Sequence, residues 1–184
     1  MKVLSAMMLF IMLTASSSAN AQFMTDRGQM ARWLRQMSVT SPEVLALDTQ
    51  SREHVACLAM NIYHEARGSI LKEQIAVAHV TLNRTQHDLY DTDVCNTVFQ
   101  YAWSHGRKRP QFSWTTRAAR SPREPEVWLQ IQNLALRVYQ GHIKDPTRGA
   151  TFFHDAHLRP DWVQKPYQVT FIGTSRFFRM RTPS

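Results

Sequence analysis

The feature that most constrains the fold is an apolar stripe at helical spacing near the middle of the chain. Its small and branched residues recur three or four positions apart, as Val55, Leu58, Ala59, Ile62 and Ala66. This spacing predicts a helix from about Arg52 to Arg67 that buries one face. Gly68 is expected to end that helix in the left-handed conformation.

Glu65 is the candidate catalytic residue, because it lies beside the buried face of this helix. It follows Leu58 by seven residues and Ile62 by three. A carboxyl group held against apolar neighbours resists ionisation, so its pKa rises toward the range in which it can donate a proton near neutral pH. The alternative is a solvated surface carboxylate close to Arg67.

The N-terminus has the pattern of a secretory signal peptide. Lys2 precedes an apolar run over residues 3–13, and a small-residue segment ends in Ala19-Asn20-Ala21. We predict a signal peptide over residues 1–21, and the apolar run is too short for a transmembrane helix of about 20 residues. The protein is therefore expected in the periplasm or outside the cell, with no stable membrane insertion after cleavage.

The net charge indicates the kind of partner, and the cysteine content predicts a disulfide. The formal net charge of +8 indicates a polyanionic partner, and export favours the cell envelope over nucleic acid. Cys57 and Cys95 are the only cysteines, and in an oxidising compartment they are expected to form one disulfide. The remaining length suits one domain over residues 53–180, preceded by an arm or linker over residues 22–52.

The rest of the chain predicts a mostly helical α+β domain with a small irregular β region. Two more amphipathic helices are expected, one from Lys72 to Thr85 and one that starts at Pro125 and stops at Gly141. Val94 to Tyr101 suits a short helix. Residues 104–125 have the composition of a loop, and their basic cluster, Arg107-Lys108-Arg109, suits a binding loop. Short aromatic and β-branched segments at residues 150–153, 168–172 and 176–178 predict strands or extended loops.

Several ordered motifs resemble the SleB-type cell wall hydrolase family over roughly residues 53–180. They are Cys57-Leu58-Ala59, Tyr63-His64-Glu65-Ala66-Arg67-Gly68, Ala76-Val77-Ala78, Leu82-Asn83-Arg84, Val94-Cys95, Gln111-Phe112-Ser113-Trp114, Gly149-Ala150-Thr151, Phe153-His154, Pro160-Asp161-Trp162, Ile172-Gly173 and Phe177-Phe178-Arg179. The resemblance implies a fold similar to lysozyme and lytic transglycosylases, with Glu65 at the position of the family's catalytic glutamate.

The resemblance also implies the reaction, which is cleavage of peptidoglycan glycan strands between N-acetylmuramic acid and N-acetylglucosamine. Ordinary glycosidases need two carboxylates, and the sequence offers no obvious second one beside Glu65. One glutamate suffices if a hydroxyl of the sugar itself attacks the anomeric carbon, which leaves a 1,6-anhydromuramic end. Glu65 then acts first as acid and later as base. We expect a monomer that uses no cofactor and no metal.

Six further residues are candidates for substrate contacts. Gln111 and Ser113 could hydrogen-bond the substrate from a loop that the resemblance places near the reacting bond. Three aromatic residues, Tyr63, Trp114 and Trp162, could stack on sugar faces. For these five residues, packing is the alternative role. His154 either touches substrate or braces its loop.

Two other functions fit parts of the sequence. A zinc-dependent N-acetylmuramoyl-L-alanine amidase would account for the eight histidines, but His64-Glu65 is followed at position 68 by glycine rather than by the second histidine of a zincin helix. His154 and His157 would need further ligands. A non-catalytic peptidoglycan-binding module would use the aromatic residues and the basic loop without cutting the strand.

Overall fold

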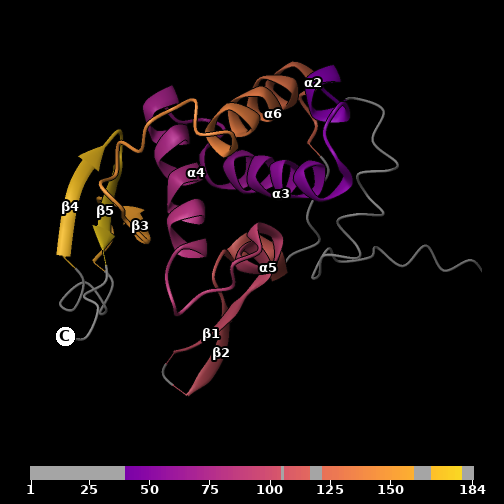
Figure 1. Cartoon of the computed structure of the whole chain (residues 1–184). Coiled ribbons are helices and arrows are strands. Elements are labelled where there is room, and N and C mark those ends of the chain that lie inside the picture. Colours follow the sequence, from indigo (N-terminus) through magenta and orange to yellow (C-terminus); the bar gives the residue numbers. More distant parts are fainter. Residues whose placement is uncertain (1–39, 105, 117–121, 160–166, 180–184) are drawn as a thin grey trace, which may run out of the picture.

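Three helices form the frame of the protein in the computed structural model. They are α3 (Thr49–Ala66), α4 (Leu71–Thr85) and α6 (Pro125–Tyr139), with α6 packed on α3 and α4 crossing the end of α3 (Figure 1). The three predicted helices are confirmed, with α3 beginning three residues before the expected start. The structure describes residues 40–104, 106–116, 122–159 and 167–179.

The beginning of α3 is set by a local cap. The side chain of Asp48 accepts a hydrogen bond from the backbone N–H of Ser51, which satisfies one of the free donors at the helix start. A short helix, α2 (Pro42–Leu45), precedes it and buries Val44 in the main core. Both features fall inside the segment expected to be an arm. The predicted signal peptide and the first part of that arm lie outside the described residues.

The end of α3 corrects one expectation. Gly68 does not adopt the left-handed conformation, because the helix ends through Arg67 in the right-handed region, at φ −58° and ψ −26°. Ser69 N–H then donates to the carbonyl of Ala66 at 2.9 Å and closes a turn. Gly141, after the end of α6, does adopt the left-handed conformation, with φ 75°.

A three-stranded antiparallel sheet covers one side of α4. Its strands are β3 (Phe152–Asp155), β4 (Tyr167–Ile172) and β5 (Ser175–Arg179), in the order β3-β5-β4 (Figure 1). The short strands predicted in this part of the chain are confirmed, and the fold is α+β. The sheet and α4 share a small apolar cluster made of Ala76, Val80, Ala150, Ile172 and Phe177.

The turn between β4 and β5 is tied to α4 by a buried carboxylate. Glu73 accepts hydrogen bonds from the backbone N–H of Thr174 at 3.2 Å and from its hydroxyl at 3.3 Å. Gly173 has φ 60°, and a Cβ there would lie 2.0 Å from a carboxylate oxygen of Glu73. This turn therefore requires glycine both for its conformation and for the close approach of Glu73.

The region expected to be a loop is a β-hairpin followed by a 3-10 helix. The short helix α5 (Val94–Phe99) ends at Phe99 rather than at Tyr101, and β1 (Tyr101–Ser104) pairs with β2 (Arg107–Pro110). Gly106 sits between the strands with φ 69°, a conformation that glycine adopts without strain. The basic cluster is therefore a strand, and the 3-10 helix η1 (Ser113–Thr116) follows it.

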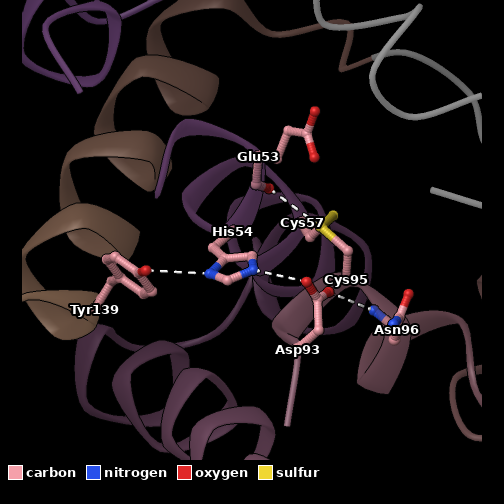
Figure 2. The surroundings of a disulfide bond; sticks show 7 residues. All are labelled: Glu53, His54, Cys57, Asp93, Cys95, Asn96 and Tyr139. Carbon is pink, nitrogen blue, oxygen red and sulfur yellow. Dashed lines mark hydrogen bonds and ion pairs between the residues drawn. A yellow bond between two sulfur atoms is a disulfide. The ribbon is translucent and has the colours of Figure 1, made fainter. Parts of the chain in front are cut away.

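The predicted disulfide is confirmed and joins α3 to α5 (Val94–Phe99). Cys57 and Cys95 are bonded with their Cα atoms 5.3 Å apart (Figure 2). Beside them, one ring nitrogen of His54 lies 2.9 Å from a carboxylate oxygen of Asp93, and the other lies 3.1 Å from the hydroxyl of Tyr139. These contacts hold α3, α5 and α6 together at the end of α3 opposite Glu65.

None of the helices in the described ranges is long and apolar enough to span a membrane.

Candidate active site

Glu65 lies in the last turn of α3 and is only partly exposed. Burial raises the pKa of its carboxyl group, and the positive charge of Arg84 opposes that rise. The direction agrees with the expectation drawn from the helical position. Within the part of the chain that the structure describes, no second carboxylate contributes to this shift and no hydrogen bond reaches the Glu65 side chain.

Arg84 acts on Glu65 through its charge, and it was not among the predicted site residues. It is only 4% exposed, on α4, and its Nε–H donates to the backbone carbonyl of Thr151 at 2.8 Å. Its Nη1 finds no hydrogen-bond partner among the described residues. Burial lowers the pKa of Arg84, while the neighbouring Tyr90 and Glu65 act to raise it. The side chain therefore places a buried positive charge beside the candidate acid.

Three aromatic rings enclose the guanidinium group of Arg84. Its central carbon lies 4.7 Å from the ring centroid of Phe112, 5.2 Å from that of Tyr90 and 5.6 Å from that of Phe152. These rings come from the segment after β2, from the connection before α5 and from β3. Cation–π contacts of this kind hold the charged group in one orientation and keep water from it.

The neighbouring residue Asn83 fixes the segment that delivers the Thr151 carbonyl. Its Nδ2 donates to the carbonyl of Ala150 and to a carboxylate oxygen of Asp145, both at 3.0 Å. Asp145 also accepts from the backbone N–H of Gly149 at 2.8 Å. Burial acts to raise the pKa of Asp145, but hydrogen bonds from its neighbours outweigh it and lower the pKa. Two motifs far apart in the sequence, at residues 83–84 and 149–151, thus meet beside Glu65.

His64, the residue before Glu65, packs into the same region without a charge at neutral pH. Its ring stacks on that of Trp114, with centroids 4.6 Å apart and an angle of 16° between the planes. Burial, helped by the charge of Arg67, lowers the pKa of His64 to about 4. Among the described residues, no group of three or more histidine, cysteine, aspartate or glutamate side chains is arranged to hold a metal ion.

Of the two roles left open for Trp114, its contacts favour packing. The side chain is 7% exposed, and its indole N–H donates to Oδ1 of Asn61 at 2.9 Å. Nδ2 of Asn61 in turn donates to the hydroxyl of Thr81 at 3.0 Å. Trp114 thereby fastens η1 to α3, and Asn61 fastens α3 to α4, one turn before Glu65 and Arg84.

Tyr63 likewise has the contacts of a packing residue. Its hydroxyl group donates to the carboxylate of Glu124 and accepts from the backbone N–H of Arg123 at 3.0 Å. The guanidinium group of Arg67 lies 4.8 Å from the centroid of the buried ring. Burial and the hydrogen bond to Glu124 raise the pKa of Tyr63. These contacts join α3 to the start of α6, and stacking of Tyr63 on a sugar stays a prediction.

The other predicted contact residues surround this region. Gln111 closes the base of the hairpin, where its backbone N–H donates to the carbonyl of Gln100 at 2.9 Å, and its side chain is partly exposed. Ser113 is exposed at the start of η1, between Phe112, which lies on Arg84, and Trp114, which lies on His64. Their contacts with substrate stay predictions.

His154 lies two residues after Phe152 on β3, and both side chains point to the same side of the strand. Its ring stacks on Phe178 with centroids 5.0 Å apart, and its Nδ1 lies 2.7 Å from the carbonyl of Asp155. These contacts brace the strand that carries Phe152 to Arg84, and a contact with substrate stays a prediction. Trp162 lies outside the described residues.

Comparison with known proteins gives a consistent result for family and fold. A family model described as Cell Wall Hydrolase matches residues 68–178, more than half of the chain, beginning three residues after Glu65. The catalytic domain of the germination-specific lytic transglycosylase SleB from Bacillus anthracis superposes with a TM-score of 0.57 at 21% identity, covering 73% of this chain and 98% of that one. The catalytic domain of the Bacillus cereus SleB protein gives a TM-score of 0.52 at 21% identity, covering 73% and 99%. No curated protein sequence gives a significant match.

Proposed function

The chain belongs to the cell wall hydrolase family, and we propose that it cuts the glycan strand of peptidoglycan between N-acetylmuramic acid and N-acetylglucosamine. The observation that carries the proposal is the carboxyl group of Glu65. Burial raises its pKa, and the charge of one buried arginine opposes that rise. The fold shared with the catalytic domain of a lytic transglycosylase supports it. So does the signal-peptide pattern at residues 1–21, which would deliver the enzyme to the wall.

Cleavage would begin with proton transfer from Glu65 to the oxygen of the glycosidic bond. The bond between that oxygen and the anomeric carbon then breaks, and positive charge develops on the sugar. The sugar's own C6 hydroxyl attacks the anomeric carbon, and its proton returns to Glu65. The products are a free hydroxyl on one sugar and a 1,6-anhydromuramic end on the other, with the carboxyl group protonated again.

Arg84 would act in this scheme as a positioning residue. Once Glu65 has given up its proton, it carries a negative charge in a partly dry environment, and the adjacent guanidinium group stabilises that charge. Because Arg84 is held by Thr151 and by three aromatic rings, its charge is already in place before the reaction. The fold shared with the catalytic domain of a lytic transglycosylase supports attack by the sugar hydroxyl over the two-carboxylate routes.

Substrate would be held by residues around the Glu65–Arg84 pair. Gln111 and Ser113 lie on the segment that covers Arg84 and His64, which suits hydrogen bonds to sugar substituents. His154 and Trp162 remain candidates for further contacts with the substrate. Tyr63 and Trp114 support the site through packing and do not stack on sugar in this proposal.

Digestion of purified peptidoglycan sacculi tests the proposal. The wild-type protein is expected to release fragments with anhydro ends, identified by mass spectrometry, and Glu65→Gln should lower the rate by about 10²–10⁴-fold. Glu126→Gln is the matched control, because Glu126 is exposed in the first turn of α6 and should leave the rate unchanged.

Three outcomes would contradict the proposal in different ways. Reducing ends that depend on Glu65 would mean simple hydrolysis of the same bond. Amide cleavage abolished by a chelator would mean a zinc amidase. Binding to sacculi with no cleavage by the wild-type protein would mean a non-catalytic module.

A further inference from the structure

The hairpin β1–β2 exposes an aromatic residue that nothing in the fold requires. Trp103 is 76% exposed, more than any other large hydrophobic residue that the structure describes. The hairpin extends away from the three-helix frame, beyond α5 (Figure 1). Single exposed aromatic residues are common on protein surfaces, so the case for a ligand depends on what surrounds this ring.

The strand register places one cation, Lys108, opposite this ring. Trp103 pairs with Lys108 and Tyr101 with Pro110, so these four side chains share one face of the hairpin. The ammonium nitrogen of Lys108 lies 4.9 Å from the centroid of the Tyr101 ring. Arg107 and Arg109 occupy the opposite face. The hairpin therefore offers one face with aromatic rings and a lysine, and a second face with two arginines.

The charge around the hairpin favours an anionic partner. Residues 101–110 contain three lysine and arginine residues and no aspartate or glutamate. The hairpin therefore carries a net positive charge. A surface of this kind attracts a polymer that carries repeated negative charges.

The hairpin is continuous with the candidate active site. Its base is closed by Gln111, and the next residue, Phe112, covers Arg84. At about 3.3 Å per residue, the pair of Trp103 and Lys108 lies roughly 10–15 Å along the chain from Phe112. The hairpin is therefore joined directly to the segment that covers Arg84, whose charge acts on Glu65.

We propose that the β1–β2 hairpin is a second binding surface for the glycan strand on which Glu65 acts. The indole of Trp103 stacks on the face of a sugar ring, and Lys108 pairs with a carboxylate of the attached stem peptide. This inference rests on the proposed function, because it takes peptidoglycan as the polymer. A strand of sugars and acidic peptides presents both the apolar ring faces and the charges that this surface matches.

Binding to purified sacculi tests the inference in the full chain carrying Glu65→Gln, which removes cleavage. Trp103→Ala and, separately, Lys108→Glu should each weaken binding by about tenfold, since aromatic and charged side chains at the centre of an interface carry much of its affinity. Raising the salt concentration should weaken the binding of sacculi more for the protein with the wild-type hairpin than for the Lys108→Glu variant.

Phe171→Ala is the matched control. Phe171 is also an exposed aromatic residue, at 55%, and the guanidinium carbon of Arg176 lies 5.9 Å from its ring centroid, but it belongs to β4. Its removal should change the dissociation constant by less than twofold. Equal thermal unfolding of all the variants would show that none of them has lost its fold.

The outcomes separate this inference from the proposed function. If the protein with Glu65 intact cleaves sacculi but the Trp103 and Lys108 variants bind as tightly as their parent, the hairpin inference is wrong and the proposed function stands. If nothing is cleaved but binding to sacculi still depends on both residues, the hairpin inference stands and the proposed function is wrong. Binding that depends on Trp103 for vesicles containing phosphatidylglycerol, but not for sacculi, would overturn the inference in favour of a membrane surface.

Discussion

Removal of the disulfide should destabilise the protein by a magnitude that follows from the loop it closes. Cys57 and Cys95 are 38 residues apart, and both Glu65 and Arg84 lie between them. In the chain-entropy treatment, a cross-link closing a loop of that length lowers the entropy of the unfolded chain enough to stabilise the fold by about 3.9 kcal/mol at 25 °C. For the 127 residues that the structure describes, this corresponds to a fall in Tm of roughly 14–15 °C.

The assay compares oxidised and reduced wild-type protein in urea unfolding at 25 °C. Reduction keeps both sulfur atoms in the core, so the difference isolates the cross-link. The double variant Cys57→Ala/Cys95→Ala should lose roughly 1–2 kcal/mol more, because both side chains are fully buried and their removal leaves a cavity. Cleavage at 25 °C should persist in whatever fraction remains folded.

A loss of less than about 1 kcal/mol on reduction would refute this reasoning. It would show that the unfolded chain is already constrained without the cross-link. An unchanged slope of unfolding free energy against urea on reduction would support that explanation, because the slope follows the surface that unfolding exposes.

Two further predictions concern the site and the sheet. Arg84→Gln removes the positive charge that opposes the raised pKa of Glu65, so this pKa should rise further, and cleavage, which needs the protonated acid, should extend to higher pH in a pH–rate profile. If the fall in cleavage rate at high pH stays at the same pH or moves to lower pH, Arg84 does not act on the pKa of Glu65. Gly173→Ala should lower the free energy of unfolding in urea by about 2 kcal/mol. The alanine would have to adopt the left-handed backbone conformation, and its Cβ would meet Glu73. Gly68→Ala is its control and should change stability by less than about 0.5 kcal/mol, since its Cβ would meet nothing within 4 Å.

The helices were readable from the sequence because their evidence is local. Apolar residues at three- and four-residue spacing predicted α3, α4 and α6, and proline at the start of α6 and glycine after its end marked its limits. The position of Glu65 beside the buried face of α3 followed from the same periodicity, as did the raised pKa of its carboxyl group. With only two cysteines in the chain, the disulfide had one possible pairing.

The hairpin was missed because its sequence signals compete. Basic residues, glycine and proline in residues 104–125 are typical of a loop, and strands of four residues are too short for alternation to be visible. Gly106 and the alternating Tyr101 and Trp103 were the available signals. The mistaken expectation for Gly68 has a related cause, because a glycine after a helix permits the left-handed conformation but does not impose it.

Arg84 shows what the sequence could not supply. Its position four residues after Val80 and seven after Val77 puts a charge on the buried face of α4, which is a detectable anomaly. Its function depends on the approach of Glu65 from α3, Thr151 and Phe152 from the C-terminal third of the chain, and Phe112 from the segment after the hairpin.

The sequence by itself determined the three helices, the cysteine pair and the candidate acid, because each depends on spacing within a few turns or on composition alone. The tertiary structure decided which charge stands next to that acid, that Trp114 and Tyr63 pack rather than face solvent, and that the basic segment is a strand bearing an exposed tryptophan. These properties depend on distances between segments 20 to 90 residues apart in the chain, such as the hydrogen bonds that join Asn61 to Thr81 and Ser41 to Gln132. Such distances are set by packing of the whole core, which no local pattern encodes.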